Sequence, residues 1–202
     1  MKKIIGIDFD NTIVCYHDVF HDVATEQGLI PKSFPKNKEK IRDYLRIHNQ
    51  ENAWTEMQGY VYGQRISHAQ PFPGFTDFVQ SMLTHHYTMY IISHKTKFPY
   101  LGKKYDLHQS AHEWLEKNHY FNIDHSNFFF LSTKDEKCKK IKQFQCHYFI
   151  DDLPELLLDA GFPSETEKLL FSPDGAVFND IIKHFKHWDD ITAYLASLSY
   201  VS

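Results

Sequence analysis

The sequence lacks the features that would assign it to a membrane, secreted or nucleic-acid-binding class. No stretch approaches the roughly 18 apolar residues that a bilayer-spanning helix requires, so we expect no membrane partner. The 22 lysines and arginines are outnumbered by 26 acidic residues, and this formal charge of −4 gives no basic field for nucleic acid. Only three cysteines are present, and no two of them form a CxxC pair. The first apolar run reaches Asp8 and Asp10 after too few residues to be the core of a signal peptide. We therefore expect a cytoplasmic protein with reduced thiols.

The sequence does contain a series of apolar runs separated by helical patterns. Such runs, with helices between them, are typical of strands in a buried parallel sheet. The predicted strands are residues 3–9, 88–93, 127–132, 146–151 and 168–172. The predicted helices are residues 74–85, 107–118, 134–145, 153–160 and 188–198. We therefore predict an α/β fold with a Rossmann-like parallel sheet.

One long segment interrupts this alternation. Residues 15–70 contain no convincing buried strand, and the spacing of their apolar residues is helical around residues 41–54. The turn sequence PFPG at 71–74 ends the segment. We therefore expect a core formed by residues 1–14 and 71–202 and a small, mostly helical cap formed by residues 15–70. This insertion follows the first strand, at the sheet edge where open α/β sheets bind ligands.

Carboxylates follow two of the predicted strands. IIGIDFDNTIV (4–14) carries Asp8 and Asp10 at its strand end, and FIDD places Asp151 and Asp152 at the end of another. Because the carboxyl ends of parallel strands meet at one sheet edge, we expect the four carboxylates to converge. Their mutual repulsion and lost solvation require a cation, and an all-oxygen site suits Mg²⁺.

Two further residues are candidates for holding an anionic oxygen, such as that of a phosphate. Ser93 ends the predicted strand TMYIIS, and Lys137 lies near the start of a predicted helix. Ser93 is alternatively a capping hydroxyl, and Lys134 is a rival for the role of Lys137. The sequence also leaves open whether Asp151 or Asp152 contacts the metal directly.

The ordered set of these motifs resembles the haloacid dehalogenase (HAD) superfamily of phosphohydrolases. DFDNT (8–12) resembles the DxDx(T/V) signature of that family, and IIS ending at Ser93 is similar to its second motif. Lys137, fourteen residues before Asp151, is similar in placement to the third motif, and Asp151–Asp152 resembles the acidic fourth.

The resemblance implies a two-step reaction. Asp8 would attack phosphorus and become an aspartyl-phosphate. Asp10 would protonate the leaving oxygen and then take a proton from the hydrolytic water. Dehalogenating members lack an acid at the position of Asp10 and the ion-pumping ATPases carry threonine there, so the acid favours phosphoryl transfer to water.

The resemblance also implies how the site is held together. Asp8, the carbonyl of Asp10 and one or both of Asp151 and Asp152 would hold Mg²⁺. Ser93 and Lys137 would steady the phosphoryl group. We expect a Mg²⁺-dependent phosphatase of a small phosphorylated substrate, such as a sugar phosphate or a nucleoside monophosphate. A phosphotransferase or mutase and a non-catalytic ligand-binding member are the alternatives, and the sequence makes no prediction of the oligomeric state.

Overall fold

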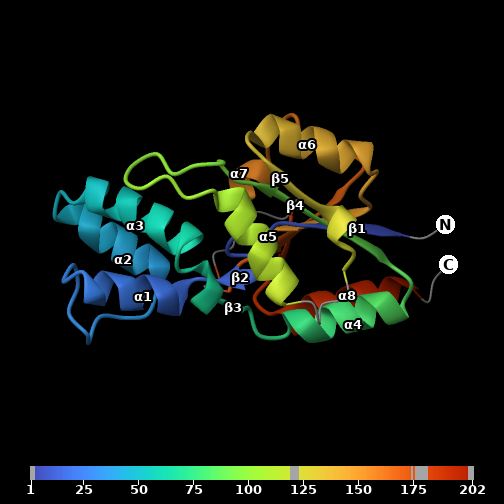
Figure 1. Cartoon of the computed structure of the whole chain (residues 1–202). Coiled ribbons are helices and arrows are strands. Elements are labelled where there is room, and N and C mark those ends of the chain that lie inside the picture. Colours follow the sequence, from blue (N-terminus) through green and yellow to red (C-terminus); the bar gives the residue numbers. More distant parts are fainter. Residues whose placement is uncertain (1–2, 119–122, 174, 176–181, 200–202) are drawn as a thin grey trace. The chain divides into compact units, whose positions relative to one another are not determined.

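The chain divides into two compact units. A computed structural model describes residues 3–118, 123–173, 175 and 182–199 (Figure 1). Residues 1–14, 71–94 and 118–202 form the first unit, and residues 15–70 and 95–117 form the second. Residues 95–117 were expected in the core. They group instead with residues 15–70, because α5 (Leu107–Lys117) packs against α3 (Glu51–Gly63) and the 3₁₀ helix η1 (Ile66–His68).

The first unit is built on a parallel sheet of six strands. Their order is β5 (Phe128–Leu131), β4 (Thr88–His94), β1 (Ile4–Ile7), β6 (Tyr148–Asp151), β7 (Glu167–Phe171) and β8 (Lys183–Phe185). Central β1 pairs with both β4 and β6, so that Ile7 lies opposite Ile91 on one side and Ile150 on the other. The predicted α/β fold with a Rossmann-like sheet is thus confirmed. Strand β8 was not predicted, because its sequence KHF is no apolar run and Lys183 is exposed.

Helices cover both faces of this sheet. In Figure 1, α6 (Lys134–Gln143) and α7 (Pro154–Leu157) lie on one face, and α4 (Phe75–Thr84) and α8 (Trp188–Ser199) lie on the other. A capping box between Thr133 and Glu136 begins α6. Helix α7 is shorter than predicted, because a turn at Asp159 accepts hydrogen bonds from the Gly161 and Phe162 amides. The 3₁₀ helix η3 (His125–Asn127) precedes β5.

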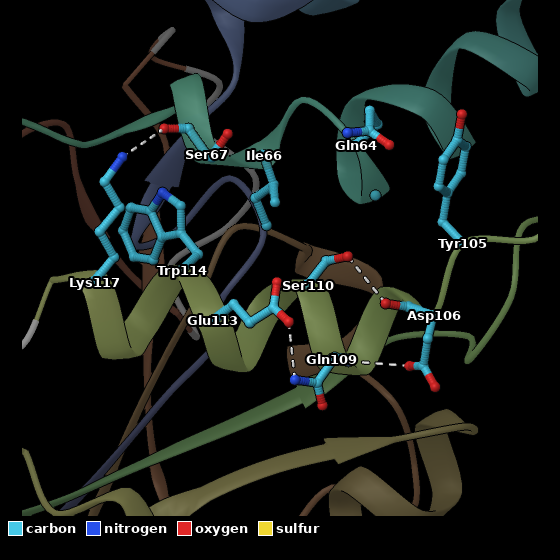
Figure 2. A pocket seen from close by; sticks show the side chains of 11 residues that line it. Gln64, Ile66, Ser67, Tyr105, Asp106, Gln109, Ser110, Glu113, Trp114 and Lys117 are labelled. Carbon is cyan, nitrogen blue, oxygen red and sulfur yellow. Dashed lines mark hydrogen bonds between the residues drawn. The ribbon is translucent and has the colours of Figure 1, made fainter.

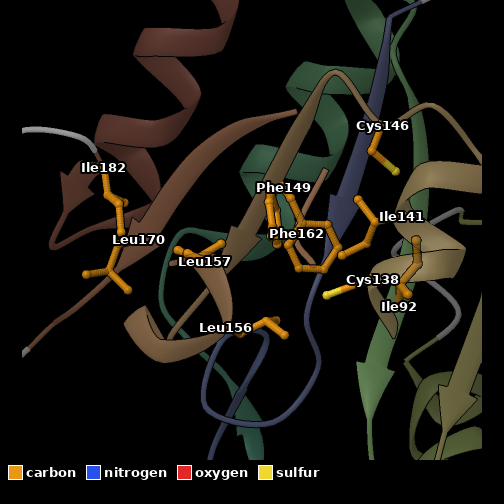
Figure 3. Packing of buried hydrophobic residues seen from close by; sticks show 10 residues of the cluster. All are labelled: Ile92, Cys138, Ile141, Cys146, Phe149, Leu156, Leu157, Phe162, Leu170 and Ile182. Carbon is orange, nitrogen blue, oxygen red and sulfur yellow. The ribbon is translucent and has the colours of Figure 1, made fainter. Parts of the chain in front are cut away.

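An apolar cluster fills the space between the sheet and the α6–α7 face (Figure 3). Two of its members, Cys138 and Cys146, are buried free thiols, as expected for reduced cysteines. The cluster also includes Ile92, Ile141, Phe149, Leu156, Leu157, Phe162, Leu170 and Ile182. One of its members, Leu156, also lines the pocket that contains Asp8, so the cluster adjoins the predicted site.

Trp188 packs at the centre of an aromatic cluster on the α4–α8 face of the sheet. Its fully buried ring lies 4.9 Å from Phe75, 4.6 Å from Phe78 and 5.3 Å from Phe171, measured between ring centroids. Its Nε1 donates a hydrogen bond of 3.2 Å to the carbonyl of Thr12. Helix α8 is therefore bonded directly to the turn that follows Asp10.

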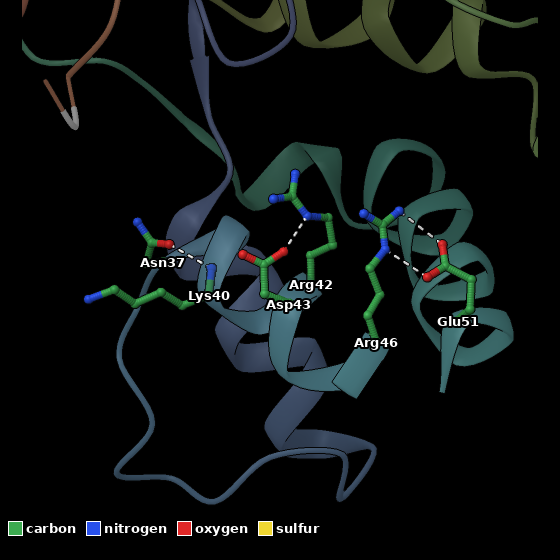
Figure 4. Close-up of polar contacts among 6 residues, drawn as sticks. All are labelled: Asn37, Lys40, Arg42, Asp43, Arg46 and Glu51. Atoms are coloured by element: carbon green, nitrogen blue, oxygen red, sulfur yellow. Dashed lines mark hydrogen bonds and ion pairs between the residues drawn. The ribbon is translucent and has the colours of Figure 1, made fainter. Parts of the chain in front are cut away.

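The second unit is mostly helical, as predicted for residues 15–70. It contains α1 (His17–Glu26), α2 (Lys38–Ile47), α3, η1 and α5. Phe20 and Trp54 stack at 5.0 Å in its interior. Figure 4 shows the polar contacts that fix α2: Asn37 caps its first turn, and Arg46 forms a bidentate pair with Glu51 at the start of α3. The short strands β2 (Val14–Cys15) and β3 (Gln70–Pro71) pair as a two-stranded ribbon.

None of the helices in the described ranges combines the length and apolar character needed to cross a bilayer.

We expect Trp188→Ala to lower the free energy of unfolding by about 3–5 kcal/mol, because it leaves a cavity among three aromatic rings. Urea unfolding monitored by circular dichroism measures this loss. Leu158→Ala is the control, since Leu158 is exposed and its truncation should cost less than about 0.5 kcal/mol. Equal effects of the two substitutions would contradict the central packing role of Trp188.

Candidate active site

A tight turn after β1 carries the first two predicted site residues. The amide of Asp8 still belongs to the sheet and donates to the carbonyl of Ile150 at 2.9 Å. The chain then turns, because the amides of Ile13 and Val14 both donate to the carbonyl of Phe9. Asn11 adopts a left-handed conformation (φ 61°), which asparagine tolerates better than most residues. Asp8 is therefore held rigidly at the strand end, and Asp10 lies within the turn.

Lys137 joins two of the predicted carboxylates. Its Nζ donates to Asp8 Oδ1 at 2.5 Å and to Asp151 Oδ2 at 2.6 Å. All three side chains are at least nine-tenths buried. The second oxygen of Asp151 accepts the amide of Leu153 at 2.9 Å, so both oxygens of this carboxylate are hydrogen-bonded. The three residues come from the strand ends of β1 and β6 and from the first turn of α6.

The charges of this group do not balance. Burial opposes the charge of Lys137, but Asp151 and Asp8 outweigh it and raise the pKa of Lys137 above its ordinary value. Burial also raises the pKa of Asp8 to about 7, against the lowering effect of Lys137. One ammonium cannot neutralise two carboxylates, so the group carries a net charge of −1 when both are ionised. This excess is met either by a proton on Asp8 or by a cation.

The carboxylates are close enough to share a metal ion. One oxygen each from Asp8, Asp151 and Asp152 lies within 4.8 Å of the others. The hydroxyl of Thr12 lies 3.4 Å from Asp152 Oδ1 and donates to it, which orients the most exposed of the three carboxylates. A set of oxygen ligands with excess negative charge fits Mg²⁺. Asp10 was predicted to contribute its carbonyl oxygen, and that contribution stays a prediction.

A small pocket of about 70 Å³ opens above these residues. Asp8, Asp10, Lys137 and Asp152 line it, so four of the predicted site residues share one cavity. Lys134 lines it as well, from the first residue of α6. Lys137 contacts the carboxylates directly, whereas the exposed Lys134 stands at the cavity wall.

Ser93 and His94 end β4, next to β1 in the sheet. The Ser93 hydroxyl is buried and has no hydrogen-bond partner within the described residues. Since a buried hydroxyl without a partner is costly, this atom is suited to a ligand oxygen. His94 lines the pocket and donates from Nε2 to the Ser132 carbonyl. Burial, together with the charges of Lys137 and Lys134, lowers the pKa of His94 and favours its neutral form.

Sequence reasoning assigned no role to two residues that position this site. Thr12 belongs to the DFDNT motif (8–12), so the motif could have indicated a role for its hydroxyl, which bonds Asp152. Trp188, which bonds the Thr12 carbonyl, lies far along the chain and had no such signal.

The second unit contains a larger pocket of about 500 Å³, which includes none of the predicted site residues (Figure 2). Several of its polar side chains are bonded within the unit: Lys117 donates to the Ser67 carbonyl, and the Gln109 amide group donates to Glu113. Cavity size alone therefore does not identify a candidate site. The convergence of charged groups around Asp8 makes the smaller pocket the candidate.

The raised pKa of Asp8 predicts a pH-dependent stability in the absence of metal. The ordinary pKa of this carboxyl is 3.8 and its value in the folded protein is about 7, so its proton stabilises the fold below about pH 4. That contribution is lost as the pH rises toward and through 7. In EDTA, we expect Asp8→Asn to gain stability relative to the unsubstituted protein between pH 5 and pH 8. Urea unfolding across this range measures the difference, and parallel pH profiles would contradict the assignment.

Comparisons with known proteins extend these observations. No protein-family model and no curated protein matches the chain. A HAD-superfamily hydrolase from Ehrlichia chaffeensis matches in structure with a TM-score of 0.59 and 15% identity, covering 98% of both chains. A HAD hydrolase from Bacillus subtilis, solved with magnesium bound, has a TM-score of 0.52 and 12% identity over 96% of this chain and 98% of its own. A dehalogenase solved as an intermediate complex has a TM-score of 0.61 and 8% identity, covering 96% of this chain and 97% of its own. This chain has the fold of the haloacid dehalogenase-superfamily hydrolases.

Proposed function

We propose that the protein is a Mg²⁺-dependent phosphatase that hydrolyses a small phosphorylated metabolite through a phosphoryl group carried on Asp8. The observation that supports this most directly is the buried contact of Lys137 with Asp8 and Asp151, beside Asp152. It combines a fixed carboxylate nucleophile with an excess negative charge that calls for a cation. The fold shared with HAD-superfamily hydrolases agrees with this chemistry.

Asp8 is suited to the role of nucleophile. Its amide is bonded into the sheet and one of its oxygens is held by Lys137, so its carboxylate has one fixed orientation. An oxygen of Asp8 would form the bond to phosphorus while the bond from phosphorus to the leaving oxygen breaks. Lys137, at 2.5 Å, lowers the pKa of this carboxyl against the effect of burial and so favours its ionised form, which a bound cation would favour further.

Asp10 is suited to proton transfer. It lines the same pocket as Asp8 but lies in the turn, where its side chain is only partly buried. Its carboxyl would give a proton to the leaving oxygen in the first step and accept one from water in the second. This acid supports phosphoryl transfer over carbon–halogen cleavage, because the dehalogenating members of the superfamily lack it.

The cation would be held by Asp8, Asp151 and Asp152, with the carbonyl of Asp10 as a further ligand. Bound Mg²⁺ supplies positive charge that offsets the repulsion between a carboxylate nucleophile and a phosphate. The magnesium-bound structure from Bacillus subtilis supports this choice of ion. Ser93, with its buried hydroxyl lacking a partner in the described residues, would donate to a phosphoryl oxygen.

We expect Asp8→Asn to lower the hydrolysis of p-nitrophenyl phosphate by roughly 10³-fold or more, since the nucleophile is lost. Asp10→Asn should lower the hydrolysis of alkyl phosphates by about 10²–10⁴-fold. Its effect on the release of p-nitrophenol in a single turnover should be smaller, because this leaving group needs no proton. Asp135→Asn is the matched control, as Asp135 is an exposed aspartate paired with Lys139.

The same assay distinguishes a phosphatase from a phosphotransferase and from a dehalogenase. Equal release of phosphate and nitrophenol supports hydrolysis, whereas a deficit of phosphate in the presence of an acceptor alcohol would indicate a phosphotransferase. Halide release from a 2-haloacid, or an Asp8→Asn variant as active as the unsubstituted protein across a broad phosphate-ester panel, would contradict the proposal.

Metal binding gives a prediction that is independent of turnover. Mg²⁺ at about 100 times its dissociation constant should stabilise the protein by about 2.7 kcal/mol, and thermal unfolding measures the shift. Asp152→Asn should weaken this stabilisation, because it removes one of the three clustered carboxylates. Asp135→Asn should leave it unchanged. Stabilisation that is the same in both variants would show that Mg²⁺ binds elsewhere.

A further inference from the structure

The loop between β4 and α5 exposes an unusual group of apolar side chains. Phe98 is 44% exposed, Tyr100 83% and Leu101 39%. Six large hydrophobic side chains are exposed in the part of the chain that the structure describes, and three of them lie within residues 98–101. Clustered exposed apolar residues mark interaction surfaces more often than scattered ones do. Nothing in the proposed phosphatase chemistry uses this loop.

The same loop is locally basic in an acidic protein. Lys97, Lys103 and Lys104 are exposed, and no acidic residue lies between positions 97 and 104. Two acidic residues lie beside it: Asp106 is 3.7 Å from Lys97, and Glu56 of α3 borders Gly102. The three lysines outnumber these two acids, so the loop keeps a positive balance while the whole chain has a formal charge of −4.

The structure holds this loop in a fixed shape. Its ends are joined by a hydrogen bond of 2.9 Å from the Leu107 amide to the Lys97 carbonyl. His108 Nε2 lies 2.6 Å from the Lys95 carbonyl and donates to it. Pro99 packs so closely on α3 that a Cβ atom placed on Gly59 would lie 2.6 Å from the Pro99 Cβ. Figure 1 shows the loop extending beside α3. Such closed surface loops are frequently functional, and the fixed ends keep the apolar side chains at the surface.

Although the overall composition predicts no membrane partner, we propose that the loop formed by residues 97–104 docks the protein on the surface of an anionic lipid bilayer. Aromatic and aliphatic side chains enter the boundary between headgroups and acyl chains, while flanking lysines pair with anionic headgroups. A protein partner would also use the aromatic rings, but it fits the three lysines less well, because lysine is depleted from protein–protein interfaces. A single-stranded nucleic acid would use the two aromatic rings by stacking but would gain little from Leu101.

Co-sedimentation of the full chain with vesicles tests this proposal. Vesicles of phosphatidylcholine with about 30 mol% phosphatidylglycerol should bind about tenfold or more protein than pure phosphatidylcholine does. Raising the salt to about 0.5 M should weaken this binding. The triple variants Phe98→Ser/Tyr100→Ser/Leu101→Ser and Lys97→Gln/Lys103→Gln/Lys104→Gln should each lose most of it. Circular dichroism checks that both variants fold.

Two matched controls show whether the position of the residues matters. Ile47→Ser removes an exposed apolar side chain from the end of α2, and Lys139→Gln removes an exposed lysine from α6. Both should bind vesicles as the unsubstituted protein does. In addition, a tryptophan introduced by Tyr100→Trp should be quenched by brominated acyl chains, whereas the buried Trp54, Trp114 and Trp188 should not be.

The proposal is overturned if anionic vesicles bind no more protein than neutral ones, or if the loop variants bind as well as the controls. It is also overturned if the loop variants lose binding to a single-stranded oligonucleotide while vesicle binding is absent. Activity on a soluble phosphate ester is measured separately, so this outcome does not depend on the proposed reaction.

Discussion

Lys137 places one ammonium group against two buried carboxylates, those of Asp8 and Asp151, at 2.5 and 2.6 Å. Removing ions from water is costly, and their mutual attraction offsets this cost only when the geometry is good and the remaining lone pairs are bonded. The Leu153 amide satisfies the second oxygen of Asp151. One negative charge stays unbalanced. Burial, together with the charge of Asp151, raises the pKa of Asp8 to about 7. A site of this kind is incomplete without a proton or a cation, and the neighbouring Asp152 makes a cation the better match.

The order of the strands brings Lys137, Asp8 and Asp151 together. Strands β1 and β6 are neighbours, so Asp8 and Asp151 emerge side by side, and α6 returns over the sheet with Lys137 in its first turn. The apolar cluster beneath α6 adjoins this contact, and a low local dielectric strengthens the attraction between buried opposite charges. From the other face, Trp188 fixes the turn that carries Asp10. Packing on both faces thus holds these charged side chains in one arrangement.

Much of this arrangement was predictable from the sequence, for identifiable reasons. The apolar runs at residues 88–93 and 168–172 lie close to β4 and β7, because strands buried on both faces need continuous apolar residues. Strand β8 escaped prediction, because an edge strand with an exposed lysine carries no such signal.

The grouping of the acidic site residues was predictable from the parallel sheet. Asp8, Asp10 and Asp152 line the same pocket because strand ends of a parallel sheet converge. Helical spacing favoured Lys137 but left Lys134 as a rival, because residues three apart lie on one helix face. Only the fold shows that Lys137 contacts the carboxylates. The grouping of residues 95–117 with residues 15–70 also depends on tertiary packing, since α5 has the pattern of an ordinary core helix.

The central claim is that Asp8 carries a phosphoryl group during the reaction. Acid quenching of the Asp10→Asn variant during turnover of p-nitrophenyl phosphate with Mg²⁺, followed by peptide mass spectrometry, tests it most directly. With this leaving group the first step needs no proton from residue 10, while the second step still needs its base. The account predicts a phosphoryl adduct that accumulates on the peptide containing Asp8. An adduct on a different residue, or none while nitrophenol is released, would contradict it.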